Sequence, residues 1–567
     1  MKAARVLLET LIGYNVKHVF GLPGETTIPL YNEWLEVGDA VKHVMLRDER
    51  NACFAADGYS KVSYKPGICE SPSSGAAHVL PSVVEAHKSA TPVIYITTDM
   101  PLHLEKKNAL TAFDQTSLFI NFVKESLTIY RGEDIPLIFR RAFRLTTTGR
   151  PGPVHIRIPV NVLEEEVGKT DLFIQKEFSK YPGHRITPTR EYVTKAVELL
   201  LNSERPLIVC GQGALYSQAW NEILELAEIL RIPVASTIAG KGCFPESHPL
   251  SVGVIGSRGG TSFSNDILSN ADLVFFIGCN VDQVATDNWT MPKPGTKVIH
   301  LDISEAEVGN HLRTDLELIG DAKSTLQEII DTVRAKAIKG TSAWVDYIKA
   351  KRSEYDSIIS IAQTEGRDYV NPLQFIKVFE RIIPKNYIIA CDPGVGAIYT
   401  STYFKVREGG RRILFNYSIG ALGYSIPAAI GAYYANPNNT VFALAGDGSF
   451  GFTAGELETL SRLQPNVKII LFNNQSFGWI RASILMHYGP RYFATDFKPI
   501  DYVKIAEGFG LVGLRVSPED LEYKIKEAIK IQGPTLIDVP VQPEDKLIPP
   551  VPSWASKAKA LGYKYIY

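Results

Sequence analysis

Two stretches near the end of the 567-residue sequence decide the fold: VFALAGDGS (residues 441–449) and VKIILFNN (residues 467–474). Each begins as an apolar, strand-like run and then turns polar. A helix-like segment from about Thr453 separates them, so the two strands are expected to lie parallel with their ends at one edge of a sheet. Because open α/β sheets bind ligands at that edge, Asp447 and Asn474 are the first candidate site residues.

The residue types at this edge suit a diphosphate held through Mg²⁺. Magnesium prefers oxygen ligands, which Asp447 and Asn474 supply. Glycine lets the backbone approach phosphate closely, and Thr453 with Glu456 fits a capping box that would start the next helix. The predicted binding residues of this segment are Gly446, Gly448 and Ser449. An ordinary strand-to-helix turn stays open as an alternative for the GDG triplet taken alone.

Strand-like and helix-like runs alternate along the whole chain, which predicts an α/β fold of parallel sheets flanked by helices. We expect three domains, at 1–175, 186–335 and 350–545, and a tail at 546–567, with breaks near the turn-forming residues 181–184 and in a Lys-rich stretch at 334–352. The two outer domains share one layout of helix, strand, small-residue loop and strand. The middle domain, with a strand entering a glycine turn at 206–213, looks Rossmann-like.

Composition narrows the classes of partner. The chain has 60 Lys plus Arg against 61 Asp plus Glu, so neither nucleic acid nor a membrane surface is expected and the ligands should be small molecules. No apolar run approaches the length of a membrane span. Because the six cysteines are scattered without a CxxC pair, we expect them to pack as small hydrophobes in a reducing, cytoplasmic compartment.

The pattern GDGS, a 23-residue spacer (residues 450–472) and NN resembles the thiamine diphosphate signature of the acetolactate synthase, pyruvate oxidase and 2-hydroxyacyl-CoA lyase superfamily. The resemblance covers nearly the whole chain. VFGLPG (19–24), RDERNA (47–52) and AADGY (55–59) resemble the family's pyrimidine-binding domain. It implies that Glu49 is the catalytic glutamate, a carboxylic acid that hydrogen-bonds N1′ of the cofactor's pyrimidine and whose pKa burial raises.

The same resemblance implies further contacts with thiamine diphosphate. The carbonyl of Gly420 accepts from the 4′-amino group, and Leu422 wedges between the two rings. The loop with Asp392 and Gly394 contacts the terminal phosphate. The carbonyl of Ser476 completes the magnesium shell of Asp447 and Asn474. Without Glu49 and Asp447, Leu422 would read as a core residue.

Substrate choice is expected to depend on other residues. His78 and Gln115 occupy positions where family members place polar side chains facing the reacting carbon. The pyruvate decarboxylases among the family's relatives have a His-His pair and a carboxylate soon after the NN motif. This sequence has no His-His pair and has Ile480 at the position of the carboxylate, so the resemblance disfavours release of a free aldehyde. The segment 278–282 and Ser483 depart from acetolactate synthases, which have an Arg and a Trp there.

These features predict a carboligase or lyase acting next to the carbonyl of a 2-keto acid, acetolactate synthase-like. The alternatives are a lyase of the 2-hydroxyacyl-CoA or oxalyl-CoA type with an acyl-CoA substrate, an FAD-dependent pyruvate oxidase-like enzyme, and a non-catalytic homologue.

The ligand of the middle domain stays open: the resemblance allows FAD, ADP or none. Arg258 either contacts a nucleotide phosphate or caps a loop. The resemblance further implies a homodimer or homotetramer with active sites at the subunit interface, Glu49 coming from one subunit and Asp447 from another. The apolar tail is expected to cover the active site or a partner.

Overall fold

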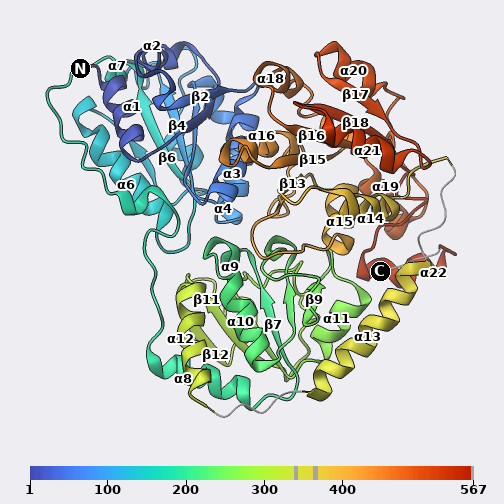
Figure 1. Cartoon of the computed structure of the whole chain (residues 1–567). Helices are drawn as coiled ribbons and strands as arrows, with labels where there is room; N and C mark the ends of the chain where they lie inside the picture. Colours follow the sequence, from blue (N-terminus) through green and yellow to red (C-terminus); the bar gives the residue numbers. More distant parts are fainter. Residues whose placement is uncertain (337–341, 362–367, 564–567) are drawn as a thin grey trace.

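A computed structural model of the chain describes residues 1–336, 342–361 and 368–563. It contains three parallel sheets of six strands each, every one flanked by helices (Figure 1). In that view the first domain lies at the upper left, the third at the upper right and the middle domain below both. The predicted α/β class with three domains is confirmed. The residue numbers chosen for the domain boundaries stay a prediction.

The first sheet has the order β2-β1-β3-β4-β6-β5, with all neighbouring strands parallel. Its strands are β1 (His18–Gly21), β2 (Lys42–Met45), β3 (Gly67–Ser71), β4 (Val93–Asp99), β5 (Ser126–Thr128) and β6 (Val154–Pro159). Its helices are α1 (Ala3–Gly13), α2 (Ile28–Val37), α3 (Glu49–Ser63), α4 (Leu80–Lys88), α5 (Gln115–Phe119), α6 (Ile135–Thr147) and α7 (Val160–Leu163).

The middle sheet has the order β12-β11-β10-β7-β8-β9, the arrangement typical of dinucleotide-binding folds, so the Rossmann-like prediction is confirmed. Its strands are β7 (Pro206–Cys210), β8 (Val234–Ser236), β9 (Ser251–Val254), β10 (Leu273–Ile277), β11 (Lys297–Asp302) and β12 (Leu316–Ile319). Its helices are α8 (Arg190–Leu201), α9 (Gln212–Tyr216), α10 (Trp220–Leu230), α11 (Ser262–Asn270) and α12 (Ala322–Arg334).

The third sheet, ordered β14-β13-β15-β16-β18-β17, repeats the strand order of the first, which bears out the shared layout of the outer domains. Its strands are β13 (Tyr387–Cys391), β14 (Ile413–Phe415), β15 (Thr440–Gly446), β16 (Val467–Asn473), β17 (Val512–Arg515) and β18 (Thr535–Pro540). Its helices are α14 (Pro372–Ile382), α15 (Val395–Tyr403), α16 (Ser425–Ala435), α17 (Asp447–Phe450), α18 (Glu456–Leu463), α19 (Gly478–Tyr488), α20 (Tyr502–Gly508) and α21 (Leu521–Lys530). Helix α13 (Ser342–Ile361) runs up from the middle domain, and α22 (Ala555–Ala560) belongs to the tail.

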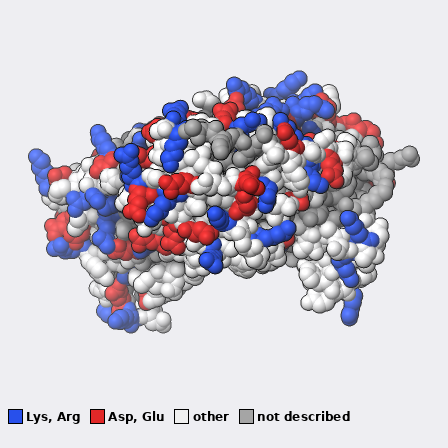
Figure 2. All heavy atoms as spheres, turned by 90° about the horizontal axis from the view of Figure 1, so that it is seen from below, with Lys and Arg blue, Asp and Glu red and all other residues white. Residues whose placement is uncertain are grey.

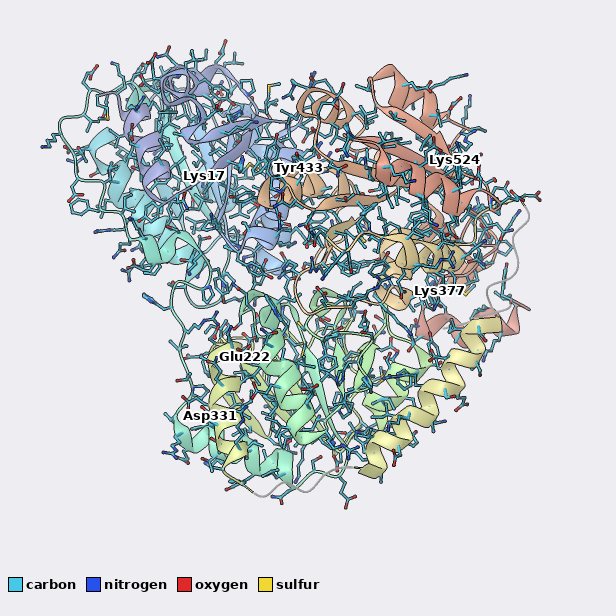
Figure 3. All side chains as sticks on the ribbon, viewed as in Figure 1. Lys17, Glu222, Asp331, Lys377, Tyr433 and Lys524 are labelled. Atoms are coloured by element: carbon cyan, nitrogen blue, oxygen red, sulfur yellow. A yellow bond between two sulfur atoms is a disulfide. The ribbon has the colours of Figure 1, made fainter. Side chains whose placement is uncertain are left out.

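The two outer domains share one hydrophobic core because α3 packs against α16. Glycine makes this close approach possible. A Cβ on Gly58 would lie 2.3 Å from the carbonyl oxygen of Ala428, and one on Gly431 would lie 1.8 Å from that of Ala55. Figure 3 labels Tyr433 on α16, which packs against this shared core. The candidate residues on α3 and those of the third sheet are therefore held in one rigid frame.

Two local predictions were wrong. The GDG triplet was predicted to be a loop, but Asp447 already opens the short helix α17. The capping box does not form, since α18 begins at Glu456 and the Glu456 carboxylate instead accepts from the backbone N–H of Arg47 (3.1 Å) and from Asn51 Nδ2 (2.9 Å). The break expected in the Lys-rich stretch at 334–352 stays a prediction: α13 begins within this stretch, and residues 337–341 lie outside the described part of the chain.

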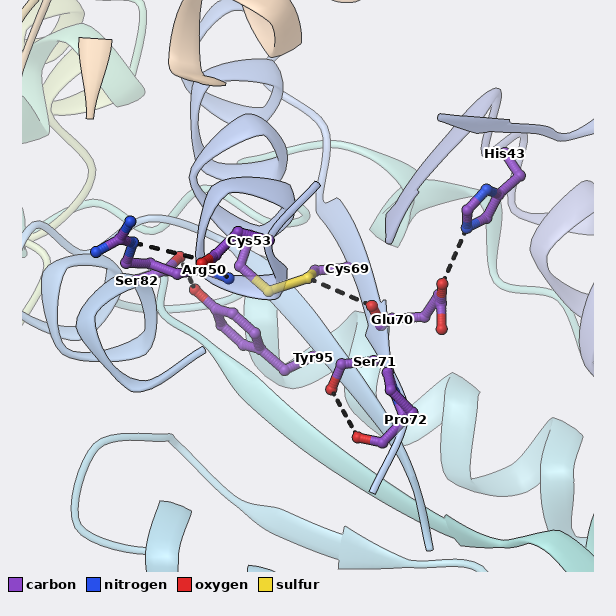
Figure 4. Close-up of a disulfide and its surroundings, with 10 residues drawn as sticks. His43, Arg50, Cys53, Cys69, Glu70, Ser71, Pro72, Ser82 and Tyr95 are labelled. Carbon is purple, nitrogen blue, oxygen red and sulfur yellow. Dashed lines mark hydrogen bonds and ion pairs between the residues drawn. A yellow bond between two sulfur atoms is a disulfide. The ribbon is translucent and has the colours of Figure 1, made fainter. Parts of the chain in front are cut away.

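The cysteine prediction was wrong for two of the six residues. Cys53 on α3 and Cys69 on β3 form a disulfide with Cα atoms 5.2 Å apart (Figure 4). Their sequence separation of 16 carries no recognisable signature, and only the packing of α3 on β3 brings the two thiols together. The other four, Cys210, Cys243, Cys279 and Cys391, are free and buried, as expected.

Charged side chains of both signs are spread over one face of the molecule. On the face seen in Figure 2, basic and acidic side chains are interspersed, without a field of one sign that would attract a polyanion. Among the helices of residues 1–336, 342–361 and 368–563, none is both long and apolar enough to cross a membrane.

Candidate active site

A cavity of about 490 Å³ opens at the carboxyl edge of the third sheet. The segments that follow β13, β15 and β16 line it, which is where the strand order reverses and where such sheets bind ligands. The lining includes Gly394, Gly420, Leu422, Gly446, Asp447, Gly448, Ser449, Asn474 and Ser476, together with Arg258, Trp479 and Glu544. The sequence therefore predicted correctly that the GDGS and NN segments converge.

Asp447 is fixed at the floor of this cavity. Its Oδ1 accepts from the N–H of Gly448 (2.9 Å) and its Oδ2 from the N–H of Gln475 (2.6 Å). Only 5% of the residue is exposed, and burial raises the pKa of the Asp447 carboxyl to about 7. A buried carboxylate held by two amides and facing a cavity suits a cation that would offset its desolvation.

Asn474 and Ser476 lie beside Asp447. The Asn474 Oδ1 accepts from both the N–H and the hydroxyl of Ser476, each at 3.0 Å. The Nδ2 of Asn474 donates to Glu544 Oε2 at 2.5 Å. Sequence reasoning missed Glu544, which follows β18 and reaches the cavity through a short connection. Glu544 packs where Gly478 has no side chain, since a Cβ there would lie 1.5 Å from Glu544 Oε2.

The wall formed by residues 416–422 is braced from two sides. Gly420 has a φ of +69°, a conformation that favours glycine, and its N–H donates to the carbonyl of Asn416 (3.2 Å). The side-chain amide of Asn416 donates to the carbonyl of Ala421 (2.5 Å). From the first domain, Glu85 on α4 accepts from the N–H of Ile419 (3.0 Å). The predicted contacts of Gly420 and Leu422 with a cofactor stay predictions, but both residues face the cavity.

The predicted phosphate loop divides into two parts. Asp392 turns its carboxylate inward, where it accepts from the N–H of Tyr424 (2.7 Å) and the hydroxyl of Ser425 (2.6 Å) at the start of α16. Pro393, Gly394 and Val395 line the cavity instead. A backbone contact from Gly394, which has a φ of +123°, is therefore better placed than a side-chain contact from Asp392.

Glu49 and His78 form a second cluster, at the corresponding edge of the first sheet. Glu49 is the first residue of α3, whose N-cap Asp48 accepts from the N–H of Arg50 (2.8 Å). Its Oε2 lies 3.0 Å from Nδ1 of His78, and only 7% of Glu49 is exposed. Gly75 makes room for the carboxylate, since a Cβ there would lie 2.4 Å from Glu49 Oε1.

Gln115 does not join this cluster by any contact of its amide. It is fully buried, donating to the carbonyl of Thr98 (3.1 Å) and accepting from the hydroxyl of Thr97 (2.5 Å). Its role at the reacting carbon stays a prediction. Within one chain, the described residues that line the 490 Å³ cavity all come from the middle and third domains, so Glu49 does not face it.

The residues at the cavity fit a magnesium diphosphate. Among the described residues, no three His, Cys, Asp or Glu side chains are grouped as a metal site, so the shell would depend on one carboxylate, on amide or carbonyl oxygens and on the diphosphate itself. Asp447, Asn474 and Ser476 offer these protein oxygens, while Gly446 has no heavy atom within 4 Å of a hypothetical Cβ and leaves space for the ligand.

Another cavity lies at the edge of the middle sheet. Gly211, Gly278 and Asp302 line a cavity of about 100 Å³, smaller than the roughly 300–1,000 Å³ of typical ligand pockets. Gly211 serves close packing, since a Cβ there would lie 2.2 Å from the carbonyl oxygen of Gly278. Arg258, one candidate for a nucleotide contact, faces the larger cavity instead.

The three domains match three parts of one family. Residues 1–118 match the N-terminal TPP binding domain of thiamine pyrophosphate enzymes, residues 193–329 their central domain, and residues 392–539 their C-terminal TPP binding domain. The chain belongs to the thiamine pyrophosphate enzyme family.

Curated relatives agree over nearly the full length. The chain is 34% identical to a probable acetolactate synthase large subunit of Methanocaldococcus jannaschii, covering 97% of this chain and 94% of the relative. It is 33% identical to one of Methanococcus aeolicus, with the same coverage. It is 31% identical to an acetolactate synthase large subunit of Cyanidium caldarium, over 99% of this chain and 96% of the relative.

Proposed function

We propose that this protein is a thiamine diphosphate- and Mg²⁺-dependent carboligase or lyase that acts next to the carbonyl of a 2-keto acid, in the manner of an acetolactate synthase. The observation that carries the proposal is the convergence of Asp447, Asn474 and Ser476 at one edge of the third sheet. When bound, thiamine diphosphate supplies the electron sink that lets a bond next to a carbonyl break and form.

The protein's own groups have separate tasks. Asp447, Asn474 and the Ser476 carbonyl would hold the metal, and Gly394, Gly446, Gly448 and Ser449 would surround the diphosphate. Glu49 would exchange a proton with N1′ of the pyrimidine. Its carboxylate is positioned by the contact with His78 and by the space that Gly75 leaves. Since Glu49 does not face the cavity of its own chain, we propose a homodimer or homotetramer in which another subunit supplies it.

The tail packs on a helix that borders the site. Ile548, Val551 and Trp554 pack on the Ala482–Met486 part of α19, and α19 begins with cavity residues. This packing supports the proposal that the tail braces the active site. A cytoplasmic location is likewise a proposal, and so is the choice between FAD, ADP and no nucleotide in the middle domain. The absorption spectrum of the purified protein tests for flavin.

Calorimetric titration tests the cofactor assignment. Wild-type protein should bind thiamine diphosphate only with Mg²⁺ present, and Asp447→Asn should weaken binding at least tenfold, by about the free energy of a lost interaction with a charged group. Asp331→Asn, an exposed change in the middle domain labelled in Figure 3, is the matched control. Binding of thiamine diphosphate that is unaffected by Mg²⁺, or by Asp447→Asn, would refute the assignment of this site.

Identification of the reaction products tests the proposed activity. With the loaded protein, a screen of pyruvate, glyoxylate and hydroxyacyl-CoA compounds should yield carbon-carbon ligation from a 2-keto acid. Cleavage of only the acyl-CoA compounds would favour the lyase alternative. Tight cofactor binding without turnover of any of them would favour a non-catalytic homologue.

A further inference from the structure

The first domain holds the wall of residues 416–422 through two buried side chains. Glu85 of α4 accepts from the N–H of Ile419 (3.0 Å). Just beyond the wall, the hydroxyl of Tyr424 donates to Asp57 of α3 (2.7 Å), and both of these residues are fully buried. Helices α3 and α4 therefore reach across the domain boundary to a segment that lines the 490 Å³ cavity.

One backbone carbonyl of this wall has no protein partner. The N–H of Gly420 donates to the carbonyl of Asn416 (3.2 Å), and the carbonyl of Ala421 accepts from the Asn416 side-chain amide (2.5 Å). Among the described residues, none donates to the carbonyl of Gly420, a residue that lines the cavity. Because Gly420 has no side chain to anchor it, the direction of this carbonyl depends on the bonds that hold its neighbours.

Glu85 fixes the backbone one residue before that carbonyl. Ile419 directly precedes Gly420, and its N–H is the donor that Glu85 holds. Burial raises the pKa of the Glu85 carboxyl to about 7, against the opposing charge of Lys61. Below neutral pH the side chain is therefore largely uncharged, and it supplies the wall with an acceptor oxygen and not with a charge.

We propose that Glu85 is a positioning residue for the bound cofactor: by holding Ile419, it aims the carbonyl of Gly420 at the 4′-amino group of thiamine diphosphate. The inference rests on the proposed function and deepens it. It assigns a residue outside the cavity to the geometry that keeps the amino nitrogen close to the reacting carbon. In the proposed dimer each first domain then serves two sites, with Glu49 completing the cavity of the other subunit and Glu85 supporting that of its own.

Proton exchange at C2 of bound thiamine diphosphate tests the inference without any keto acid. The protein loaded with Mg²⁺ and thiamine diphosphate is diluted into D₂O and quenched with acid, and NMR measures the remaining C2 proton. Glu85→Leu removes the acceptor but fills most of the space, so exchange should slow about ten- to a hundredfold, as for a misplaced reacting group. Glu85→Gln keeps an acceptor oxygen and should exchange nearly as fast as wild type.

Two further measurements separate positioning from general damage. In titration calorimetry, Glu85→Leu should change the affinity for thiamine diphosphate much less than it slows exchange, because the proposed diphosphate contacts lie around Asp447. Ser82→Ala, on the same helix, loses a buried hydrogen bond to Tyr95 (2.9 Å, Figure 4) that does not reach the wall, so its exchange should match wild type. Glu85→Ala replaces the leucine variant if that variant does not fold.

The contrary outcomes are distinct. Unchanged exchange without the Glu85 acceptor, or equal slowing in Ser82→Ala, overturns the inference. Slowing in Glu85→Gln as strong as in Glu85→Leu also overturns it, because an acceptor oxygen would then not suffice. A wild-type protein that binds no thiamine diphosphate would overturn the inference together with the proposed function. If exchange behaves as expected but no 2-keto acid is consumed, the proposed activity fails and the positioning role of Glu85 stands.

Discussion

Glu544 brings a second carboxyl group to the proposed metal-binding residues. It is 4% exposed and is tied to Asn474, while the next residue, Asp545, pairs with Arg481 of α19 at 3.0 Å. The segment after β18 is thereby fastened to both the cavity floor and the helix that borders it. We interpret Glu544 as the group that fixes which way the Asn474 amide points, because its Oε2 accepts from Nδ2 of Asn474.

Replacing Glu544 by Ala should weaken Mg²⁺-dependent binding of thiamine diphosphate about tenfold, since a buried amide is left without its partner. Glu544→Gln, which keeps an acceptor oxygen, should bind nearly as wild type does. Titration calorimetry on both variants measures this. Tighter binding in Glu544→Ala would show that Glu544 opposes the diphosphate and would end this interpretation.

Glu85 should make stability depend on pH. Burial raises the pKa of this carboxyl to about 7 from 4.5, against the opposing charge of Lys61. Between these values the folded chain keeps a proton that the unfolded chain has lost, so stability falls as pH rises through this range, by about 1.4 kcal/mol per unit. The melting temperature of Glu85→Gln should therefore equal that of wild type near pH 4.5 and exceed it above pH 7.

Scanning calorimetry across this pH range checks the prediction, with the exposed Glu36→Gln as a control that should follow wild type at every pH. A constant difference between Glu85→Gln and wild type would mean that Glu85 is ionised throughout in the folded protein.

The site residues that sequence predicted share one property. Asp447 and Asn474 each follow a buried strand, so the sheet itself brings them together and the pattern of apolar runs is sufficient to find them. Glu85 braces the cavity wall from α4, and Glu544 lines the cavity from the connection after β18. Their positions depend on interdomain packing and on a loop path, which no local pattern records.

At the scale of elements, α3 unites several functions. It begins at Glu49, its middle glycine lets it approach α16, and Cys53 ties its second turn to β3. Strand β3 leads directly to the turn with Gly75 and His78, the two residues that contact Glu49. The disulfide shown in Figure 4 therefore joins the helix and the strand that together set the position of the catalytic candidate.

Loss of this disulfide should lower stability. Closing a loop of this length constrains the unfolded chain by about 3 kcal/mol, so the double variant Cys53→Ala/Cys69→Ala should melt several degrees below oxidised wild type. The melting temperature of the oxidised wild-type protein is measured in parallel as the control. Phosphine reductant should lower the melting temperature of wild type and leave the double variant unchanged. A wild-type protein purified with both thiols free would contradict the bond.

Sequence patterns predicted elements well and their ends less well. The repeated strand order of the outer domains follows from repeated apolar periodicity, which survives divergence of the residues themselves. The capping box at Thr453 does not form because tertiary contacts replace the local one. The Glu456 carboxylate accepts hydrogen bonds from Arg47 and Asn51 of the first domain instead. Such a competition between near and distant partners is invisible in a single stretch of sequence.

For the whole molecule, the main consequence is that one chain holds two half-sites. The edge of the first sheet presents Glu49, while the edge of the third sheet presents Asp447, and the described lining of the metal-binding cavity includes no residue of the first domain. The shared strand order makes the outer domains pseudo-equivalent. A two-fold assembly could then set the first domain of each chain against the third domain of the other and create two identical complete sites.

Complementation between inactive variants tests this arrangement. Glu49→Gln and Asp447→Asn should each abolish activity alone. After the two proteins are mixed under conditions that exchange subunits, a mixed dimer has one doubly altered site and one site with both native residues. Random exchange makes half of the dimers mixed, so roughly a quarter of wild-type activity should return. Carbon-carbon ligation from pyruvate measures it, and Glu49→Gln mixed with an Asn474→Ala variant should behave in the same way. Mixing Asp447→Asn with Asn474→Ala should restore nothing, because both changes fall in one half-site. If activity returned in none of the three mixtures, Glu49 and the proposed metal-binding residues would have to belong to one subunit. Activity in the last mixture would instead place Asp447 and Asn474 on different subunits.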